Sequence, residues 1–412
     1  MKYVVNNQVV LLRAPQGPIA DHISSFTALV STQGYAPKSI HYQVRLAACF
    51  SRWLKQKGVE LHDITPDHLM RYLRYRARQL KPRLDDAATL SHLIDFLRSE
   101  GVILAGKESV RRLTPVERCA LAYEQYLREV RALAKATILN YVPVIRRFLK
   151  DRFGNSPVIL SRLCVRDVVR FVQRQASRMH RKRAKLMTTA LRSFLKYTRY
   201  CGEVTLDLAA AVPIVPHWSM PSIPRAISVD HVRQLLASID RDTAMGRRDY
   251  AILLLLARLG LRSGEVVFLE LDDIDWNTGT VNVRGKGGPH NEFPLSLEVG
   301  EAIAAYLREG RPLSTSRRIF LRAKAPIRGF QGASSVSSVV RHSLKRAGIN
   351  APTCGAHQFR HGLATEMLRQ GASLDEISAV LGHRHPQTTT IYTKVDVEAL
   401  RSLALPWPGG VR

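Results

Sequence analysis

Apolar residues recur at helical spacing through the first half of this chain, and this periodicity limits the folds that it can adopt. Leu46, Phe50 and Trp53 lie three or four positions apart on one stripe, and Val144 and Phe148 begin another. Alternation typical of β-strands is sparse up to about residue 205. We therefore expect this half of the chain to consist of helical bundles.

Two segments of this helical half look like copies of one unit. Ile40 and Ile138 are each followed ten residues later by a phenylalanine, and Tyr72 has its counterpart in Phe171. The offset between the copies is 98 residues for the first pair and 99 for the second. A constant offset over several positions favours duplication of a small bundle, with chance similarity between amphipathic helices as the alternative.

Each copy also carries a run of cations. The chain has 62 Lys and Arg against 34 Asp and Glu, a formal net charge of +28, and such a surface favours a polyanionic partner such as nucleic acid. A solvated basic face or anionic lipid is the alternative. The candidates for contacts with DNA are Arg74, Arg76 and Arg78 in the first run and Arg178, Arg181, Lys182, Arg183 and Lys185 in the second.

The pattern of expected secondary structure changes after a proline-rich stretch. Four prolines between Pro213 and Pro224 predict an extended linker. Beyond it, helices alternate with two short strands, 280–284 and 292–295, around a glycine-rich turn at 285–288. The expected fold is mainly α with a small antiparallel β-sheet in the C-terminal domain. The expected domains are 1–105, 110–205, a linker at 206–227, an α+β domain at 228–395 and a helix or tail at 396–412.

Other features of the sequence predict a reduced, cytoplasmic environment. No apolar stretch approaches the roughly 20 residues that span a bilayer, and the N-terminal apolar run is too short for a signal peptide. The cysteines are odd in number, scattered and without a Cys-x-x-Cys pair, so we expect neither disulfides nor a zinc site. They are Cys49, Cys119, Cys164, Cys201 and Cys354.

Two arginine-centred motifs stand out in the C-terminal domain. Arg262 follows a glycine at an expected helix junction, and Glu265, three residues on, can reach back to hold its guanidinium group. His357 and Arg360 lie three residues apart, which on a helix places an imidazole and a cation on one face. His357 with His361 at i, i+4 is an alternative metal pair, but a third ligand is not evident.

Three further residues complete the pattern. Gly382 suits the C-terminus of a helix and would present His383 at the following turn. Tyr392 comes nine residues after that histidine, and Lys286 lies in the glycine-rich turn between the two expected strands. Each motif is weak by itself, since most tyrosines are core or surface residues and most lysines in turns only keep the turn solvated.

The order and spacing of these motifs are specific. Arg-x-x-Glu, a lysine in a β-turn, His-x-x-Arg-His, Leu-Gly-His and a tyrosine nine residues later resemble the tyrosine recombinase family, which includes phage integrases and Xer-type resolvases. The resemblance covers residues 228 to about 400 closely. Residues 110–205 are similar to the helical core-binding domain of the family. Residues 16–100 match less well, as either a second core-binding-like module or an arm-type DNA-binding module.

The resemblance implies a role for each residue of the pattern. Arg262 and Arg360 match the two arginines that clamp the scissile phosphate, and Glu265 matches the acidic residue that orients the site. Tyr392 matches the nucleophile. A phenol with a pKa near 10 attacks phosphorus only with help from a base or from cationic surroundings, which the arginines and histidines would supply.

Three more residues would move or hold protons. Lys286 matches the lysine that protonates the leaving 5′-oxygen, and His357 and His383 match positions that hydrogen-bond the phosphate and assist proton transfer. Residues 289–291 depart from the family, because further basic residues often follow the lysine there.

The function implied is site-specific recombination or integration of double-stranded DNA through a 3′-phosphotyrosine intermediate and a Holliday junction, without metal or ATP. The implied assembly is a homotetramer on paired sites, with partner recombinases or accessory proteins as further partners and no membrane. The protein would serve a mobile element, phage or replicon, and its C-terminal segment would dock on a neighbouring protomer. Two alternatives remain open: a type IB topoisomerase, and a DNA-binding regulator with a vestigial site.

Overall fold

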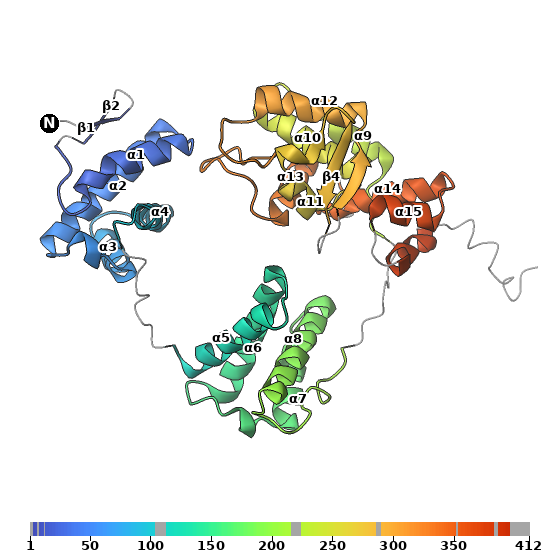
Figure 1. The fold of residues 1–412 in the computed structure, drawn as a ribbon, viewed down its shortest axis with the longest axis horizontal. Coiled ribbons are helices and arrows are strands. Elements are labelled where there is room, and N and C mark those ends of the chain that lie inside the picture. The colour runs from blue at the N-terminus through green and yellow to red at the C-terminus, as the bar shows by residue number, and fades with distance from the viewer. Residues whose placement is uncertain are drawn as a thin grey trace, which may run out of the picture. The chain divides into compact units, whose positions relative to one another are not determined.

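The computed structural model describes residues 3–5, 8–11, 13–103, 113–215, 224–285, 290–351, 353–382 and 386–395. Contacts between residues divide the chain into two units, Ala105–Pro221 and a second that combines Met1–Leu104 with Ser222–Arg412. The expected domain boundaries stay predictions, and the parts of the chain are described separately below (Figure 1).

The N-terminal module begins with a short β-hairpin and continues as a helical bundle. The hairpin, which the periodicity does not predict, pairs β1 with β2 in antiparallel register. Phe26, Phe50 and Leu93 are fully buried in the core that the helices enclose. The elements are β1 (Tyr3–Val5), β2 (Gln8–Leu11), η1 (Ala20–His22), α1 (Ile23–Thr32), α2 (Pro37–Gln56), η2 (Leu61–Asp63), α3 (Pro66–Ala77) and α4 (Asp86–Ser99).

The second module is a separate helical bundle with its own core. Phe148, Phe171 and Phe194 are fully buried at its centre, and Leu208 and Val212 pack against the same core beyond the last helix. The bundle therefore continues into the start of the stretch expected to be a linker. Its elements are α5 (Pro115–Glu129), α6 (Lys135–Phe153), η3 (Leu160–Arg162), α7 (Val165–Ala176) and α8 (Arg181–Tyr200).

The two modules share one plan, as the repeated sequence pattern predicts. In each, a 3-10 turn separates a first pair of helices from a second pair, and η3 follows η2 at an offset of 99 residues. The rings of Phe50 and Tyr72 lie 5.1 Å apart in the first module, and those of Phe148 and Phe171 lie 5.1 Å apart in the second. Within each bundle, an aromatic contact therefore joins the second helix to the third.

The C-terminal part packs helices around the buried helix α10. Every residue from Ala251 to Leu256 is fully buried, so this helix forms the centre of the core. The elements are α9 (Val229–Ala237), α10 (Ala244–Arg258), α11 (Ser263–Phe268), η4 (Leu271–Asp273), β3 (Ile274–Asp275), β4 (Thr280–Arg284), β5 (His290–Pro294), α12 (Leu297–Ala305), η5 (Tyr306–Gly310), α13 (Ala333–Arg346), α14 (His357–Arg369), α15 (Leu374–Leu381) and η6 (Pro386–Val395).

A small sheet lies against this core, and the fold class expected from the sequence is confirmed. The strands pair antiparallel in the order β3-β4-β5, and β4 has the bounds expected for the first strand of the hairpin. Strand β3 is two residues long and was not expected. Among the described residues, no helix is long and apolar enough to cross a membrane.

The separate cores generate a prediction about stability. Phe50→Ala and Phe148→Ala each remove a fully buried ring and should each cost about 3–5 kcal/mol. Hydrogen exchange of the full chain, read by mass spectrometry, should speed up within residues 13–103 for the first variant and within 113–215 for the second. Faster exchange in both modules from a single substitution would contradict the independence of the two cores.

Candidate active site

Arg262 lies at the junction between α10 and α11, where Glu265 holds it as its spacing predicts. Its backbone N–H donates to one carboxylate oxygen of Glu265 at 2.7 Å, and its Nη1 donates to the other at 2.6 Å. The carboxylate thus caps the first turn of α11 and aligns the guanidinium group at once. About a third of the Arg262 side chain remains exposed, so part of the fork can still meet a ligand.

Arg360 is buried on the first turn of α14, with 2% of its surface exposed. Its Nη1 donates to the backbone carbonyl of Gly260 at 2.8 Å, and its Nη2 donates to the carbonyl of Leu381. Gly260 has a φ of +59°, and a Cβ there would lie 2.9 Å from a methyl group of Leu363. Glycine is therefore required at this position, both for the backbone conformation and for the close packing that brings its carbonyl to Arg360.

Both guanidinium groups meet at the C-terminal end of α15. Arg262 donates through Nη2 to the carbonyl of Gly382 at 3.4 Å, next to the Leu381 carbonyl that binds Arg360. Carbonyl groups at a helix C-terminus carry partial negative charge and attract cations. Burial, and then the neighbouring Arg262, nevertheless lower the pKa of Arg360 to about 10. The site therefore concentrates positive charge that, among the described residues, Glu265 and backbone oxygens offset.

Two histidines continue the same face of α14. His357 and His361 pack edge to face, with ring centroids 4.5 Å apart. Desolvation, followed by the charges of Arg360 and Arg262, lowers the pKa of His357. Desolvation, followed by His357 and Arg360, lowers the pKa of His361 to about 4. Both rings are therefore neutral at pH 7 in the absence of an anion.

Tyr392 projects from η6 into this cluster. Its ring is 1% exposed and packs against Ala364, Ile377 and Leu381. Its hydroxyl lies 3.0 Å from Nδ1 of His361. Burial raises the pKa of Tyr392, and the charges of Arg360 and Arg262 act in the opposite direction. The structure thus groups Arg262, Glu265, His357, Arg360 and Tyr392, five of the seven site residues expected from the sequence.

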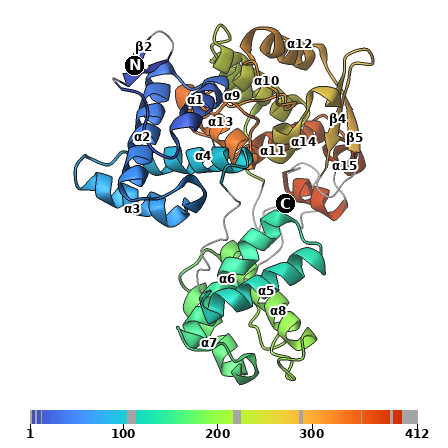
Figure 2. The same cartoon turned by 60° about the vertical axis from the view of Figure 1, so that its left-hand side comes forward.

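The remaining two, Lys286 and His383, lie outside the described residues, but their neighbours are placed. Arg284, at the end of β4, pairs with Asp273 at 3.6 Å and with Glu270 at 3.7 Å, which fixes the base of the turn. A Cβ on Gly382 would lie 2.5 Å from Nδ2 of Asn291, so strand β5 touches the end of α15 (Figure 2). The hairpin that carries Lys286 therefore borders the arginine cluster.

His361 and Asn291 are residues of this site that the sequence does not predict. In the sequence, His361 stands out only as half of a possible metal pair, whereas in the structure its ring contacts the hydroxyl of Tyr392 at hydrogen-bond distance. Residue 291 stands out only as a departure from the family pattern. The adjacency of His361 to Arg360 was the available signal for the first. Only the packing of β5 on α15 reveals the second.

Most of the expected DNA-contact residues are exposed, but Arg76 is not. Its guanidinium group lies 3.4 Å from the carboxylate of Asp86 and donates to the hydroxyl of Tyr42 at 3.3 Å, with 15% of the side chain exposed. Arg76 therefore serves to neutralise a buried carboxylate, and this ion pair makes it a poorer candidate for DNA contact than the exposed cations; the contact itself stays a prediction. The exposed candidates are Arg74, Arg78, Arg178, Arg181, Lys182, Arg183 and Lys185.

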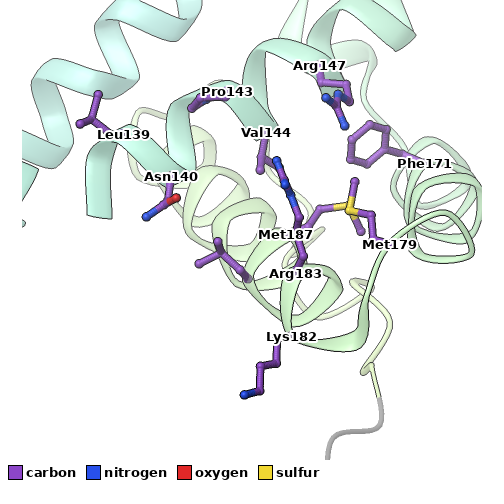
Figure 3. Close-up of a pocket in the computed structure, with 11 residues that line it drawn as sticks. Leu139, Asn140, Pro143, Val144, Arg147, Phe171, Met179, Lys182, Arg183 and Met187 are labelled. Atoms are coloured by element: carbon purple, nitrogen blue, oxygen red, sulfur yellow. The ribbon is translucent and has the colours of Figure 1, made fainter. Parts of the chain in front are cut away.

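A pocket adjoins the basic run of the second module. It has a volume of about 420 Å³ and lies between α6 and α8 (Figure 3). Val144, Phe171 and Met187 give it an apolar lining, while Lys182 and Arg183 line it from the first turn of α8. Lys182 and Arg183 thus lie at the edge of an apolar pocket, next to the start of α8. Four of the residues expected to contact DNA lie at that start.

The fold and the grouped side chains define a class of DNA strand-transfer enzymes that use a tyrosine. Residues 225–399 match the phage integrase family. The chain is 58% identical to a putative integrase/recombinase of Sinorhizobium fredii over 99% of both chains. It is 32% identical to the tyrosine recombinase XerD of Mycobacterium tuberculosis, over 70% of this chain and 95% of that one. The chain therefore belongs to the tyrosine recombinase family of site-specific DNA recombinases.

Solved structures share the fold. The XerH recombinase bound to a palindromic difH substrate matches with a TM-score of 0.55 at 19% identity, over 82% of this chain and 94% of that one. A lambda integrase tetramer bound to a Holliday junction matches with a TM-score of 0.50 at 15% identity, over 72% of this chain and 88% of that one. The family expected from the sequence motifs is thus confirmed.

The contact between Gly382 and Asn291 gives a second prediction. Gly382→Ala should strain a backbone with a φ of +57° and push β5 away, so that hydrogen exchange in residues 280–294 speeds up several-fold. Gly348→Ala is the matched control, because Gly348 has a φ of +66° but nothing within 4 Å. Both variants should lose about 1–2 kcal/mol of stability, because a side chain is strained in the left-handed conformation. Equal exchange in the hairpin of both variants would refute the contact.

Proposed function

We propose that this recombinase cleaves and rejoins double-stranded DNA at specific sites through Tyr392, which becomes linked to the 3′-phosphate. One observation carries the proposal: the Tyr392 hydroxyl lies 3.0 Å from the residue that follows Arg360 on α14, where two guanidinium groups cluster at the end of α15. Arg262 and Arg360 would bind the non-bridging oxygens of the scissile phosphate, and His357 would hydrogen-bond the same group. Lys286 would protonate the leaving 5′-oxygen, His383 would assist, and Glu265 would keep Arg262 aligned.

The electrostatics of the site support this assignment. Negative charge develops on the phosphate oxygens as the phenol attacks, and donors already held in place stabilise that charge without reorganisation. Two backbone carbonyls and the packing around Gly260 hold Arg360, while Glu265 holds Arg262. An anion placed between the two cations also relieves the repulsion that lowers the pKa of Arg360. The site is therefore complementary to a phosphodiester before DNA arrives.

The proposal extends to assembly and energetics. A phosphotyrosine conserves the energy of the broken phosphodiester bond, so rejoining would require neither ATP nor Mg²⁺. Exchange of strands between two sites would pass through a Holliday junction on a homotetramer, the assembly seen for the lambda integrase of similar fold. The exposed cations of the two helical modules would bind phosphates and position the protein. The protein would serve a mobile element, phage or replicon, with accessory proteins or partner recombinases as further components.

Separate groups for binding and for chemistry give a third prediction. Arg262→Ala should reduce covalent attachment to DNA by about 10²- to 10³-fold. Its affinity for duplex DNA should change by less than about threefold, because many other cations carry that affinity. DNA sites are first obtained by trapping covalent complexes on fragmented genomic DNA and sequencing the junctions. Tyr392→Phe is the control without attachment; parallel loss of binding and cleavage in Arg262→Ala would contradict the assignment.

The two alternatives are separable with the same substrates. A recombinase yields Holliday junctions and rearranged products from paired sites, whereas a type IB topoisomerase relaxes supercoiled plasmid without them. A regulator with a vestigial site forms no covalent complex on a nicked duplex, even though it binds the site. Covalent trapping that depends on Tyr392, together with exchanged products, would exclude both.

The C-terminal segment gives a fourth prediction. Residues 396–412 lie outside the described residues, and we propose that they dock on a neighbouring protomer and control cleavage in trans. Deleting them should lower tetramer formation and strand exchange at least tenfold while leaving binding of a single site unchanged. Native gels with fluorescent duplexes measure both quantities. Unchanged synapsis and exchange after the deletion would remove this part of the proposal.

A further inference from the structure

The hydrogen bond between His361 and Tyr392 is not accounted for by the roles assigned so far. Nδ1 of His361 lies 3.0 Å from the tyrosine hydroxyl, and the two ring centroids are 5.6 Å apart. His361 follows Arg360 directly on α14, so the residue that binds the phosphate and the one that holds the nucleophile share a single helix turn. Among the hydrogen bonds of the described residues, this one involves the reacting oxygen itself.

Both partners of this hydrogen bond are neutral. Burial and the nearby His357 and Arg360 keep His361 neutral by lowering its pKa to about 4, and burial raises the pKa of Tyr392. In the tautomer that carries the ring hydrogen on Nε2, Nδ1 accepts the hydrogen of the phenol. The resting pair is therefore a neutral acid facing a neutral base.

We propose that His361 is the proton acceptor for Tyr392 when its hydroxyl attacks the DNA phosphorus. The proposal rests on the proposed function of Tyr392. In the cleavage step, the O–H bond of Tyr392 breaks and its proton moves to Nδ1 of His361, giving an imidazolium. The phenolic oxygen bonds to phosphorus, the bond from phosphorus to the 5′-oxygen breaks, and a separate acid, Lys286, protonates that oxygen. Rejoining reverses each transfer.

The other groups around Tyr392 are less suited to this step. Arg360 on α14 and Arg262 on α11 are cations without an accepting lone pair. Glu265 on α11 is engaged by the Arg262 guanidinium and backbone N–H. His357 contacts the ring of His361 edge on and lies one helical turn nearer the start of α14, toward the expected phosphate position. Among the described residues, His361 is the group that has both an accepting lone pair and a hydrogen-bond contact with the Tyr392 hydroxyl.

Arrival of the phosphate strengthens the base. Burial first, then His357, then Arg360 disfavour an imidazolium at His361, and the scissile phosphate would bring negative charge next to Arg360. Neutralising Arg360 acts to raise the pKa of His361 above its value of about 4 in the free protein. Proton transfer from Tyr392 thus becomes more favourable once the substrate is in place, and the base stays weak in the absence of DNA.

The central experiment substitutes His361 by asparagine. The amide oxygen of Asn occupies the place of Nδ1 and can still accept the hydrogen bond, but it cannot take the proton. His361→Asn should lower the rate of covalent attachment by about 10²- to 10⁴-fold while DNA affinity and thermal stability stay near those of the parent protein. His342→Asn, at an exposed position on α13, is the matched control and should cleave normally.

A second substrate separates the base from the acid. A duplex with sulfur in place of the bridging 5′-oxygen has a leaving group that departs without protonation. This substrate should restore cleavage by Lys286→Ala but leave His361→Asn as slow as before. Restoration of His361→Asn by the sulfur substrate would overturn the proposal, as would a normal rate of this variant on ordinary DNA.

The pH profile tests the same step without a variant. On the sulfur substrate, the rate requires neutral His361, so it should fall about tenfold per unit as pH drops below the pKa of His361 in the complex. That pKa should lie above the value of about 4 in the free protein, and the fall should be absent in His361→Asn. A profile that is flat in the parent protein, or equal in both proteins, would overturn the proposal.

The failure of this proposal is distinguishable from failure of the proposed function. If Tyr392→Phe still attached covalently to DNA, the function assigned to Tyr392 would fail and the role of His361 with it. If Tyr392→Phe were inactive but His361→Asn cleaved at the parent rate, the nucleophile would stand and the base would be elsewhere.

Discussion

The arrangement of the active site depends on two guanidinium groups that both donate hydrogen bonds to carbonyl oxygens at the end of α15. Like charges repel, and burial adds to the cost of holding them together. Hydrogen bonds from the two guanidinium groups to carbonyl oxygens at the α15 terminus and to Glu265 offset part of this unfavourable energy. It leaves a net positive charge that no described acidic side chain besides Glu265 offsets at the cluster. In the proposed function, a phosphodiester would supply the missing negative charge, so affinity for the reacting group would be built into the fold.

The two helical modules differ from the arginine cluster in the kind of DNA contact that their cations would make. Each encloses its own aromatic core, and each carries exposed cations in the last turn of its third helix or after it. Their cations would attract the phosphate backbone in general, whereas the arginine cluster would bind a single phosphate in a defined orientation. Arg76 shows the limit of inferring contacts from charge alone, since its partner Asp86 is buried beside it. A duplicated fold therefore does not imply duplicated contacts.

How much the sequence predicts depends on how local each interaction is. Glu265 reaches Arg262 across three residues, Gly382 ends α15 in the left-handed conformation, and β4 begins and ends where alternation indicates. These features follow from periodicity and capping rules. The contact of Asn291 with Gly382 and the hydrogen bond of His361 with Tyr392 join segments that are distant along the chain. Spacing does not encode such contacts, so only the packed structure shows them.

Burial of Tyr392 has a chemical consequence that connects the core to the reaction. Its ring packs among Ala364, Ile377 and Leu381, which raises the pKa of the phenol and keeps the hydroxyl protonated. The same apolar surroundings would limit the access of water to a phosphotyrosine formed there. A 5′-hydroxyl held by paired DNA would then compete well against hydrolysis. The apolar packing that makes the nucleophile harder to ionise thus also favours rejoining over permanent cleavage, provided that a base such as His361 accepts the proton.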